Sequence, residues 1–416
     1  MANAPHVYPV TRRFIGWGPE LNPGTAVVPT VTVPMTTFTP VDKITYLHDA
    51  AWRNAMAGLY NLIPGPIIAD LSMGGPFFSD TYPYLLNNIL GDYYVSAMSN
   101  QGASVTSVAA YPAGTTAITL TSGTLTLNTP YLFYLGDDSG PAEVITPTAG
   151  SLTGPYTLNR PLYYAHTITS TLTASTVNSL YTHNFALLNS GTGAGGAANA
   201  QPVTHTITDY TGVPATSGAR QYAFGCLSET SLTGTSTALI LWDAKAMGLG
   251  SVIAANAPTA AISPVVPQAA WTTTVAFAGS QVFNVSEWKL QITRKLEPIW
   301  TDQGQQSPYA IPRGELTAQC NFLFDPALDE SQFLYYLNNT QPTLQITAAN
   351  GLPGVKASTL TISAQIAGFD TAAIDDKKTV FGFDQQALLI ANTTNAGISG
   401  GFSPLAVTIQ NATPSY

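Results

Sequence analysis

The sequence predicts a mainly β fold, and three observations point to it. Apolar and polar residues alternate over long stretches between residues 285 and 366. Short Thr-rich runs separated by Gly, Pro and Asp fill residues 104–175, as in a small all-β module. Charged residues make up 9% of the chain, against about 25% in an average soluble protein, while 45% of residues are hydrophobic. This composition favours packed β-structure whose surface is covered by neutral polar groups.

The longest alternation is GELTAQCNFLF, which starts at Gly314. Its apolar face consists of Leu316, Ala318, Cys320, Phe322 and Phe324. Its polar face consists of Glu315, Thr317, Gln319 and Asn321. Because successive side chains of a strand point to opposite faces, the pattern predicts one strand of roughly 36 Å at about 3.3 Å per residue. This strand is longer than the common strand of about five or six residues.

A second long strand is predicted upstream, in SEWKLQITRKL. Its apolar residues Trp288, Leu290 and Ile292 alternate with Lys289, Gln291 and Thr293. Phe283 and Val285 keep the opposite phase, which a β-bulge near Ser286 and Glu287 explains. The intervening DQGQQSPYAIPRG is too long for a two-residue hairpin. We therefore expect the strands to pair across a long loop, where Lys289 could form an ion pair with Glu315.

A third one-faced strand is predicted in STLTISAQI, which begins at Ser358. Its apolar residues are Leu360, Ile362, Ala364 and Ile366, and its polar residues include Thr361, Ser363 and Gln365. The runs ALLIAN and SPLAVTIQN follow it and complete the set of predicted strands.

Helices are predicted at three places. Ile44, Leu47, Ala51, Ala55 and Leu59 have helical spacing, and Pro64 and Gly65 would end that helix. In DTYPYLLNNILGDYY, Asp80 or Thr81 could cap, Pro83 lies in the first turn and Gly91 stops the helix. In FDPALDESQFLYYLNN, Asp329 could cap, Asn338 and Asn339 end the helix, and Leu328, Phe333, Leu334 and Leu337 share one side.

The Thr-rich segment interrupts the main fold, because the long strands that could close a core come after it. We therefore predict a core domain formed by residues 1–103 and 176–416, with a small inserted β domain at residues 104–175. The tract GTGAGGAANA at residues 191–200 lacks the Lys and Ser or Thr placement of a phosphate-binding loop and is predicted to be an exposed loop.

No pattern of residues indicates catalysis, a cofactor or a metal site. The five histidines show no i,i+4 pair, and the neighbours His48 and Asp49 would point to different faces of a helix. Asp137, Asp138 and Glu143 supply too few oxygens for calcium and favour a solvated hairpin turn. The two cysteines, Cys226 and Cys320, are interpreted as small core residues. We expect a protein that is not an enzyme.

The net charge of −9 disfavours a nucleic-acid-binding protein, because such proteins place clusters of Lys and Arg against phosphates. The adjacent basic pairs are Arg12-Arg13, Arg294-Lys295 and Lys377-Lys378. No apolar run is long enough to cross a bilayer, and the N-terminal residues do not have the pattern of a secretory signal. We expect a protein made in the cytoplasm with no membrane partner.

The order of these features resembles that of the major tail tube proteins of long-tailed bacteriophages. The resemblance rests on PMTTFTPVDKITYLHDAAWRNAMAGLY, DTYPYLLNNILGD, the strand pair from SEWKLQITRKLEPIW to RGELTAQCNFLF with its following helix, and SPLAVTIQNATPSY. It covers residues 1–100 and about 178–416. YLFYLGDDSGPAEVIT and LNRPLYYAH are similar to a small β-module that is sometimes inserted in such proteins.

The resemblance implies a β-sandwich or barrel core with a flanking α-helix. It also implies hexameric rings that stack into a tube, long strands that join an inner β-barrel shared by the subunits, and a place in the virion. Its expected partners are other copies of the chain, other tail proteins (tape measure, terminator and distal tail proteins), and DNA in transient, non-specific passage during genome ejection.

On this interpretation the polar faces of the long strands line the lumen. The candidate lumen residues are Lys289, Gln291, Glu315, Thr317, Gln319, Asn321, Thr361, Ser363 and Gln365. Few cations are expected along the path of DNA, because each Lys or Arg paired to phosphate adds adhesion. Two alternatives share the low charge and the Thr-rich strands: another virion structural protein, such as a capsid or decoration subunit, and a β-rich surface adhesin.

Overall fold

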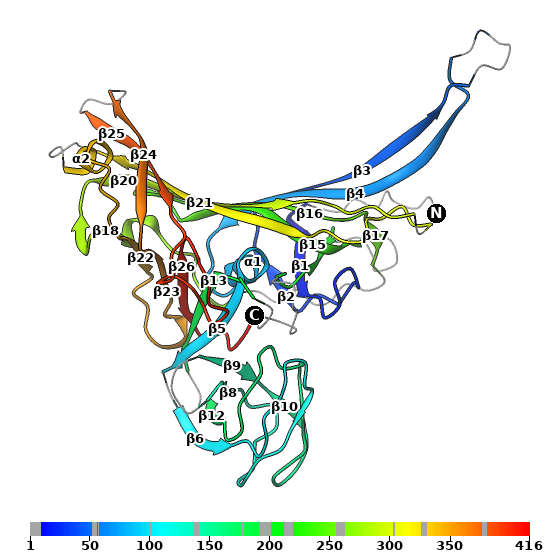
Figure 1. The fold of residues 1–416 in the computed structure, drawn as a ribbon, viewed down its shortest axis with the longest axis vertical. Coiled ribbons are helices and arrows are strands. Elements are labelled where there is room, and N and C mark those ends of the chain that lie inside the picture. Colours follow the sequence, from blue (N-terminus) through cyan, green and yellow to red (C-terminus); the bar gives the residue numbers. More distant parts are fainter. Residues whose placement is uncertain are drawn as a thin grey trace, which may run out of the picture.

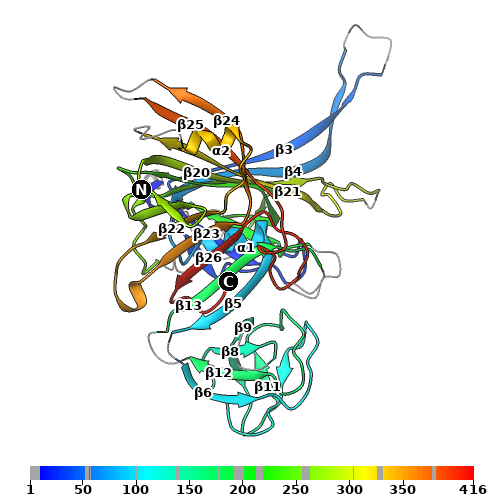
Figure 2. The same cartoon turned by 60° about the vertical axis from the view of Figure 1, so that its left-hand side comes forward.

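The computed structural model describes residues 10–51, 56, 58–99, 101–136, 141–175, 179–190, 201–211, 219–254, 263–302, 304–325, 331–376 and 381–416. The fold is mainly β, as the sequence predicts. In these residues two large antiparallel sheets, of twelve and eleven strands, form a sandwich, and a three-stranded sheet at one end packs against the last strands of the eleven-stranded sheet (Figures 1 and 2). Each large sheet is open, because its terminal strands do not pair with each other in the described chain.

The twelve-stranded sheet has the order β2-β1-β14-β15-β20-β21-β25-β24, and β16 extends it from β15 to β4 and β3. Its strands are β1 (Phe14–Pro19), β2 (Val31–Val33), β3 (Thr37–Asp49), β4 (Asn61–Pro76), β14 (His205–Tyr210), β15 (Ala219–Thr235), β16 (Leu241–Leu249), β17 (Val252–Ile253), β20 (Val285–Leu296), β21 (Arg313–Phe324), β24 (Ala367–Asp375) and β25 (Gly382–Leu389).

The eleven-stranded sheet has the order β19-β18-β22-β23-β26-β13-β5-β9-β8-β12-β6. Its strands are β5 (Gly91–Met98), β6 (Gln101–Thr106), β8 (Tyr131–Tyr134), β9 (Ala142–Ile145), β12 (Thr171–Ser175), β13 (Tyr181–Leu187), β18 (Thr273–Phe277), β19 (Ser280–Val282), β22 (Leu344–Ala349), β23 (Thr359–Ala364) and β26 (Ala406–Asn411). The three-stranded sheet consists of β7 (Ala117–Ile118), β10 (Pro147–Ala149) and β11 (Tyr156–Leu158).

The apolar faces of the two large sheets share one core. Phe277 of β18 lies in the contact, with its ring centroid 5.3 Å from that of Phe322 and 6.1 Å from that of Phe324, both on β21. Cys320 of β21 and Ile362 of β23 are fully buried in the same cluster. Since side chains alternate along a strand, the polar residues between these core residues point outward from the sandwich, on opposite sides for the two sheets.

The long strands β20 and β21 pair as predicted. Their register shifts between Val285 and Glu287, which confirms the β-bulge predicted there. Lys289 lies opposite Asn321. The predicted ion pair of Lys289 with Glu315 is therefore wrong, because the two residues are separated by several register positions along the pair.

The helix predicted from Ile44 to Leu59 is wrong for the described residues. Residues 44–49 of this segment belong to β3, which pairs with β4 from Thr37–Gly74 out to Asp49–Asn61. Val41, Ile44 and Tyr46 favour strands, and the pairing of β3 with β4 overrides the helical spacing. His48 and Asp49 lie at the far end of β3. Trp52–Ala55 and Ala57 lie outside the described residues.

The outer parts of β3 and β4 leave the sandwich as a two-stranded ribbon, which we call the arm (Figure 1). The arm comprises residues 44–49 of β3 and 61–67 of β4, because β4 stops pairing with β16 at Ile68. At about 3.3 Å per residue it extends roughly 20 Å beyond the sheet.

Helix α1 (Tyr82–Ile89) is confirmed, and it is buried along its whole length, in contact with β15 and β5. Pro83 occupies its first turn, and Gly91 follows its end with φ +88°, a conformation that favours glycine. Thr81 precedes the helix without a side-chain capping hydrogen bond.

Helix α2 (Ser331–Leu337) is confirmed, and of its predicted apolar side Phe333 is half-buried and stacks on Phe383, whereas the prediction is wrong for the described leucines. Leu334 and Leu337 are exposed. Tyr335 instead turns toward the core, where its ring stacks on Phe369. An aromatic residue was available for the core contact, so the leucines are left at the surface. Leu328 and Asp329 lie outside the described residues.

The segment expected as an inserted module has an apolar cluster of its own, which includes Ile118, Phe133 and Tyr156. Its strands β8, β9 and β12 continue the eleven-stranded sheet, because β9 pairs with β5 at Ala142 and Val95. The tract at residues 191–200 lies outside the described residues.

Candidate functional site

The candidate site is the polar outer face of the twelve-stranded sheet. One row of side chains crosses five neighbouring strands there and is joined by hydrogen bonds; we call it the polar ladder. It consists of Lys245 on β16, Glu229 on β15, Gln291 on β20, Gln319 on β21 and Gln386 on β25. At about 4.8 Å between strands, the row is roughly 19 Å wide.

The bonds of the polar ladder converge on the carboxylate of Glu229 from both sides. Lys245 Nζ donates to Glu229 Oε2 at 2.8 Å, and Gln291 Nε2 donates to Glu229 Oε1 at 2.9 Å. Gln319 Nε2 donates to Gln291 Oε1 at 3.3 Å, and Gln386 Nε2 donates to Gln319 Oε1 at 2.7 Å. Each amide thus donates toward Glu229. The hydrogen bond from Lys245 to Glu229 raises the pKa of the lysine, which is nearly fully solvated.

The folded chain explains why these residues align. Gln291 and Gln319 are direct register partners, and Glu229 is the register partner of Lys245. Strand β16 alternates exposed positions such as Asp243 with buried positions such as Trp242 and Ala244, which places Lys245 on the outer face. At one end the row meets a hollow of about 310 Å³, lined in part by Thr39, Ser72 and Lys289.

Six of the nine candidate lumen residues lie on this face. Gln291 and Gln319 belong to the polar ladder, and the other four, Lys289, Glu315, Thr317 and Asn321, flank it on β20 and β21.

The structure does not bring the remaining three candidates to this face. Thr361 and Ser363 lie on β23 of the eleven-stranded sheet, and Gln365 follows that strand. Their buried neighbours Leu360 and Ile362 belong to the shared core, so Thr361 and Ser363 point out from the opposite side of the sandwich.

Sequence reasoning missed three members of the polar ladder, Glu229, Lys245 and Gln386. For Lys245 a signal exists, because LWDAKAMGL alternates Trp242 and Ala244 with Asp243 and Lys245. Glu229 is harder to find, since the register of β15 with β16 shifts between Leu227 and Glu229.

Carboxylates outnumber lysines on the outer face of the strands that carry the polar ladder. The carboxylates are those of Glu229, Asp243, Glu287, Glu315 and Asp384, and the lysines are Lys245, Lys289 and Lys295. Beside them, Lys43 of β3 forms an ion pair with Asp70 of β4. The face is therefore net acidic.

Two arginines of the same strands point into the core instead. Arg294 donates to the carbonyl oxygens of Ile89 and Gly314, and Arg313 donates to those of Asn88 and Pro202. The guanidinium groups thereby bind the C-terminal carbonyls of α1, where the helix dipole favours positive charge. Burial lowers the pKa of Arg294 to about 9 and also lowers that of Arg313. The basic pair Arg294-Lys295 is thus not a surface cluster.

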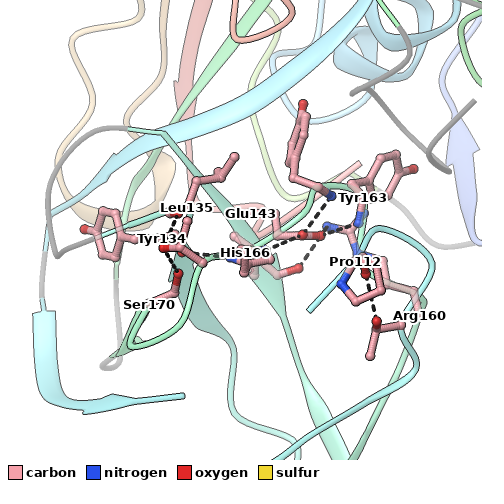
Figure 3. Close-up of polar contacts among 12 residues, drawn as sticks. Pro112, Tyr134, Leu135, Glu143, Arg160, Tyr163, His166 and Ser170 are labelled. Carbon is pink, nitrogen blue, oxygen red and sulfur yellow. Dashed lines mark hydrogen bonds and ion pairs between the residues drawn. The ribbon is translucent and has the colours of Figure 1, made fainter. Parts of the chain in front are cut away.

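Glu143 was interpreted as part of a solvated turn, and this is wrong, because Glu143 is buried. Its carboxylate accepts from the backbone N–H groups of Tyr163 (2.9 Å) and Tyr164 (3.2 Å) and contacts His166 Nε2 at 2.8 Å (Figure 3). His166 Nδ1 lies 2.7 Å from the carbonyl oxygen of Tyr134. Asp137 and Asp138 lie outside the described residues.

Both ring nitrogens of His166 face oxygen atoms, one of the Tyr134 carbonyl and one of the Glu143 carboxylate. The ring also stacks on Phe133, with centroids 3.6 Å apart. Glu143 and His166 are both buried, and Arg160 Nη2 lies 4.0 Å from the Glu143 carboxylate. Glu143 and His166 therefore have a structural role, because their hydrogen bonds link β8, β9 and the chain at Tyr163 within the segment 104–175.

In the described residues no group of three or more His, Cys, Asp and Glu side chains is placed to hold a metal ion. Cys226 and Cys320 are both buried with free thiols, as predicted for core residues. No helix within the described ranges is long and apolar enough to cross a membrane.

A scan against models of protein families and a search of curated proteins found no match to this sequence.

Proposed function

We propose that this chain is a structural subunit of a phage tail tube, in which the face that carries the polar ladder forms part of the channel wall. Hexameric rings of the chain stack into the tube, and DNA passes through it during ejection. This proposal combines the resemblance of the sequence with the composition of one sheet face.

The observation that carries the proposal is the polar ladder. A wide closed barrel needs a wall of strands with an apolar face toward the subunit core and a polar face toward water. The outer face around the polar ladder meets this need, because neutral amides of Gln291, Gln319 and Gln386 follow one another across adjacent strands. Their hydrogen-bonding groups are largely engaged with each other, which leaves a smooth neutral band.

The charges of the face also suit the passage of DNA. A wall that is net acidic offers few sites where phosphate could pair with a cation, so the polymer experiences little adhesion. Lys245 on this face is already paired with Glu229. Arg294 and Arg313, which could otherwise bind phosphate, are used inside the subunit to hold α1.

The open edges of the twelve-stranded sheet fit assembly into a ring. Within the described chain β24 pairs only with β25, and β3 pairs only with β4. Such edges are an aggregation hazard in a monomer, and pairing with the next subunit removes the hazard.

Electron microscopy of the purified chain tests this function. We expect six-fold rings or hollow tubes, formed spontaneously or when tail initiation proteins are added. Dispersed monomers that bind glycans in an array would contradict the proposal and support the adhesin. Closed shells, or binding to the outside of a capsid, would support the other virion alternative.

A further inference from the structure

The arm exposes apolar side chains on both of its faces. Ile44, Tyr46, Leu47, Leu62 and Ile63 are each between 40% and 52% exposed. Leu47 lies opposite Ile63 on one face, while Tyr46 and Leu62 belong to the other. An isolated two-stranded ribbon is at best marginally stable in water, and an apolar ribbon gains most from a partner that covers it.

A hollow with two exposed aromatic residues lies where β18 and β19 of the eleven-stranded sheet meet β15 and β20 of the twelve-stranded sheet. Trp271, directly before β18, is 75% exposed, and Phe283, directly after β19, is 83% exposed. Between them the hollow measures about 210 Å³, and its other lining residues include Val275, Val282 and Trp288. None of the described residues that line it is charged. We call it the Trp271–Phe283 hollow.

The backbone next to the hollow can accept a strand. Strand β19 is the terminal strand of its sheet and pairs only with β18 in the described chain. Strand β3, which forms one side of the arm, is likewise terminal. Edge strands present unpaired backbone groups, so a second ribbon can add to β19 by strand addition while its side chains fill the hollow.

The arm and the hollow cannot meet within one copy. Figure 1 shows the arm and β18 at opposite sides of the molecule, separated by the length of the twelve-stranded sheet. Two complementary surfaces at opposite sides of one chain produce a head-to-tail contact, which closes into a ring or continues as a filament.

We propose that the arm of one copy docks in the Trp271–Phe283 hollow of a second copy of this chain, with β3 beside β19. The occupant is another copy because its arm brings exposed apolar side chains and a free strand edge to a hollow that has two exposed aromatic rings, no charged residue among its described lining, and a free strand edge beside it. This inference rests on the proposed tube function for its biological setting, and its contact is defined by residues outside the polar ladder.

Cysteine crosslinking tests the contact directly. Leu62→Cys and Phe283→Cys are introduced in separate preparations, and the copies are mixed under assembly conditions and oxidised. The native Cys226 and Cys320 are buried and do not compete. A matched control replaces Phe283→Cys by I168C, because Ile168 is 61% exposed in the segment 104–175, away from β19.

We expect a crosslinked dimer between the Leu62→Cys and Phe283→Cys copies and only background crosslinking with the control. Phe283→Ala is expected to weaken self-association roughly tenfold or more. Phe402→Ala, which truncates a 59% exposed ring elsewhere, should leave it unchanged. Circular dichroism and the denaturation midpoint establish that both variants are folded.

The outcomes separate the docking site from the tube function. Rings or tubes without the specific crosslink overturn the docking site and leave the tube proposal standing. The specific crosslink in small open oligomers that never form rings supports the docking site and argues against the tube. A chain that neither crosslinks nor associates at any concentration overturns both.

Discussion

Replacing Phe277 by Ala would remove the side chain that joins the two sheets. Phe277 is 1% exposed, and its ring lies within 6.1 Å, centroid to centroid, of four others: Phe322 and Phe324 from β21, Tyr335 from α2 and Phe369 from β24. These partners come from the opposite sheet and from α2, so the truncation opens a cavity between layers rather than at a surface.

The expected loss follows from this burial. Truncating a buried Phe to Ala typically costs about 3 to 5 kcal/mol, which includes the lost transfer free energy and the cavity. The aromatic contacts of Phe277 place it in the upper part of this range, because each such pair contributes about 0.5 to 1.5 kcal/mol beyond area burial. We expect the free energy of unfolding to fall by about 4 kcal/mol.

Phe283 provides the matched control, since it ends the same hairpin but is 83% exposed. Phe283→Ala should change the free energy of unfolding of the unassembled chain by no more than about 0.5 kcal/mol. Both are measured by guanidinium denaturation, followed by tryptophan fluorescence. Equal losses for the two variants, or a loss below about 1 kcal/mol for Phe277→Ala, would refute the sandwich arrangement.

Three further predictions concern pH, the channel face and the segment 104–175. Burial lowers the pKa of His183 and His205 to about 3, so below pH 6.5 the unfolded chain binds protons that the folded chain does not. The free energy of unfolding should therefore fall by up to about 1.4 kcal/mol per pH unit for each histidine as the pH drops, and His205→Gln should reduce the slope measured by denaturation. Gln319→Lys should slow DNA release from particles in a salt-dependent way, whereas Thr361→Lys on the opposite sheet should not, as measured by ejection kinetics. Glu143→Gln should weaken the segment 104–175 by about 2 to 3 kcal/mol, because the buried carboxylate that binds the His166 ring and two backbone N–H groups is lost, and faster amide exchange in β8 and β9 should report it.

Each of these has a result that would count against it. An unchanged pH slope in the His205 variant would mean that the ring is not buried in its neutral form. Equal slowing of ejection by lysine at both positions would remove the distinction between the two sheet faces. Amide exchange in β8 and β9 that is unaffected by Glu143→Gln would show that the carboxylate does not have this structural role.

The sequence predicted the long strands well because one face of each is buried, so a strict period of two is imposed on their residues. The bulge near Glu287 was also predictable, since it reverses that phase. The arm was not. Its residues pack on neither a core face nor a single solvent face, so their alternation is lost and the spacing from Ile44 to Leu59 matches a helix by chance.

The candidate site was predicted in part for a related reason. Gln291 and Gln319 stand on strands with clear alternation, but which other strands lie beside them depends on long-range pairing. Thr361 lies on the polar face of β23, which alternates as clearly as β20 and β21 do. Only the packing of the two sheets shows that this face is on the opposite side of the sandwich from the polar ladder. Sequence periodicity gives the face of a strand but not the side of the molecule to which that face belongs.

The most direct test of the account is a density map of the assembled particle by electron cryomicroscopy, at a resolution that shows side chains. The account predicts a six-fold tube in which Gln291, Gln319 and Gln386 of every subunit face the lumen and Thr361 faces away from it. A tube whose lumen is lined by β23, or by a concentration of Lys and Arg side chains, would contradict the account.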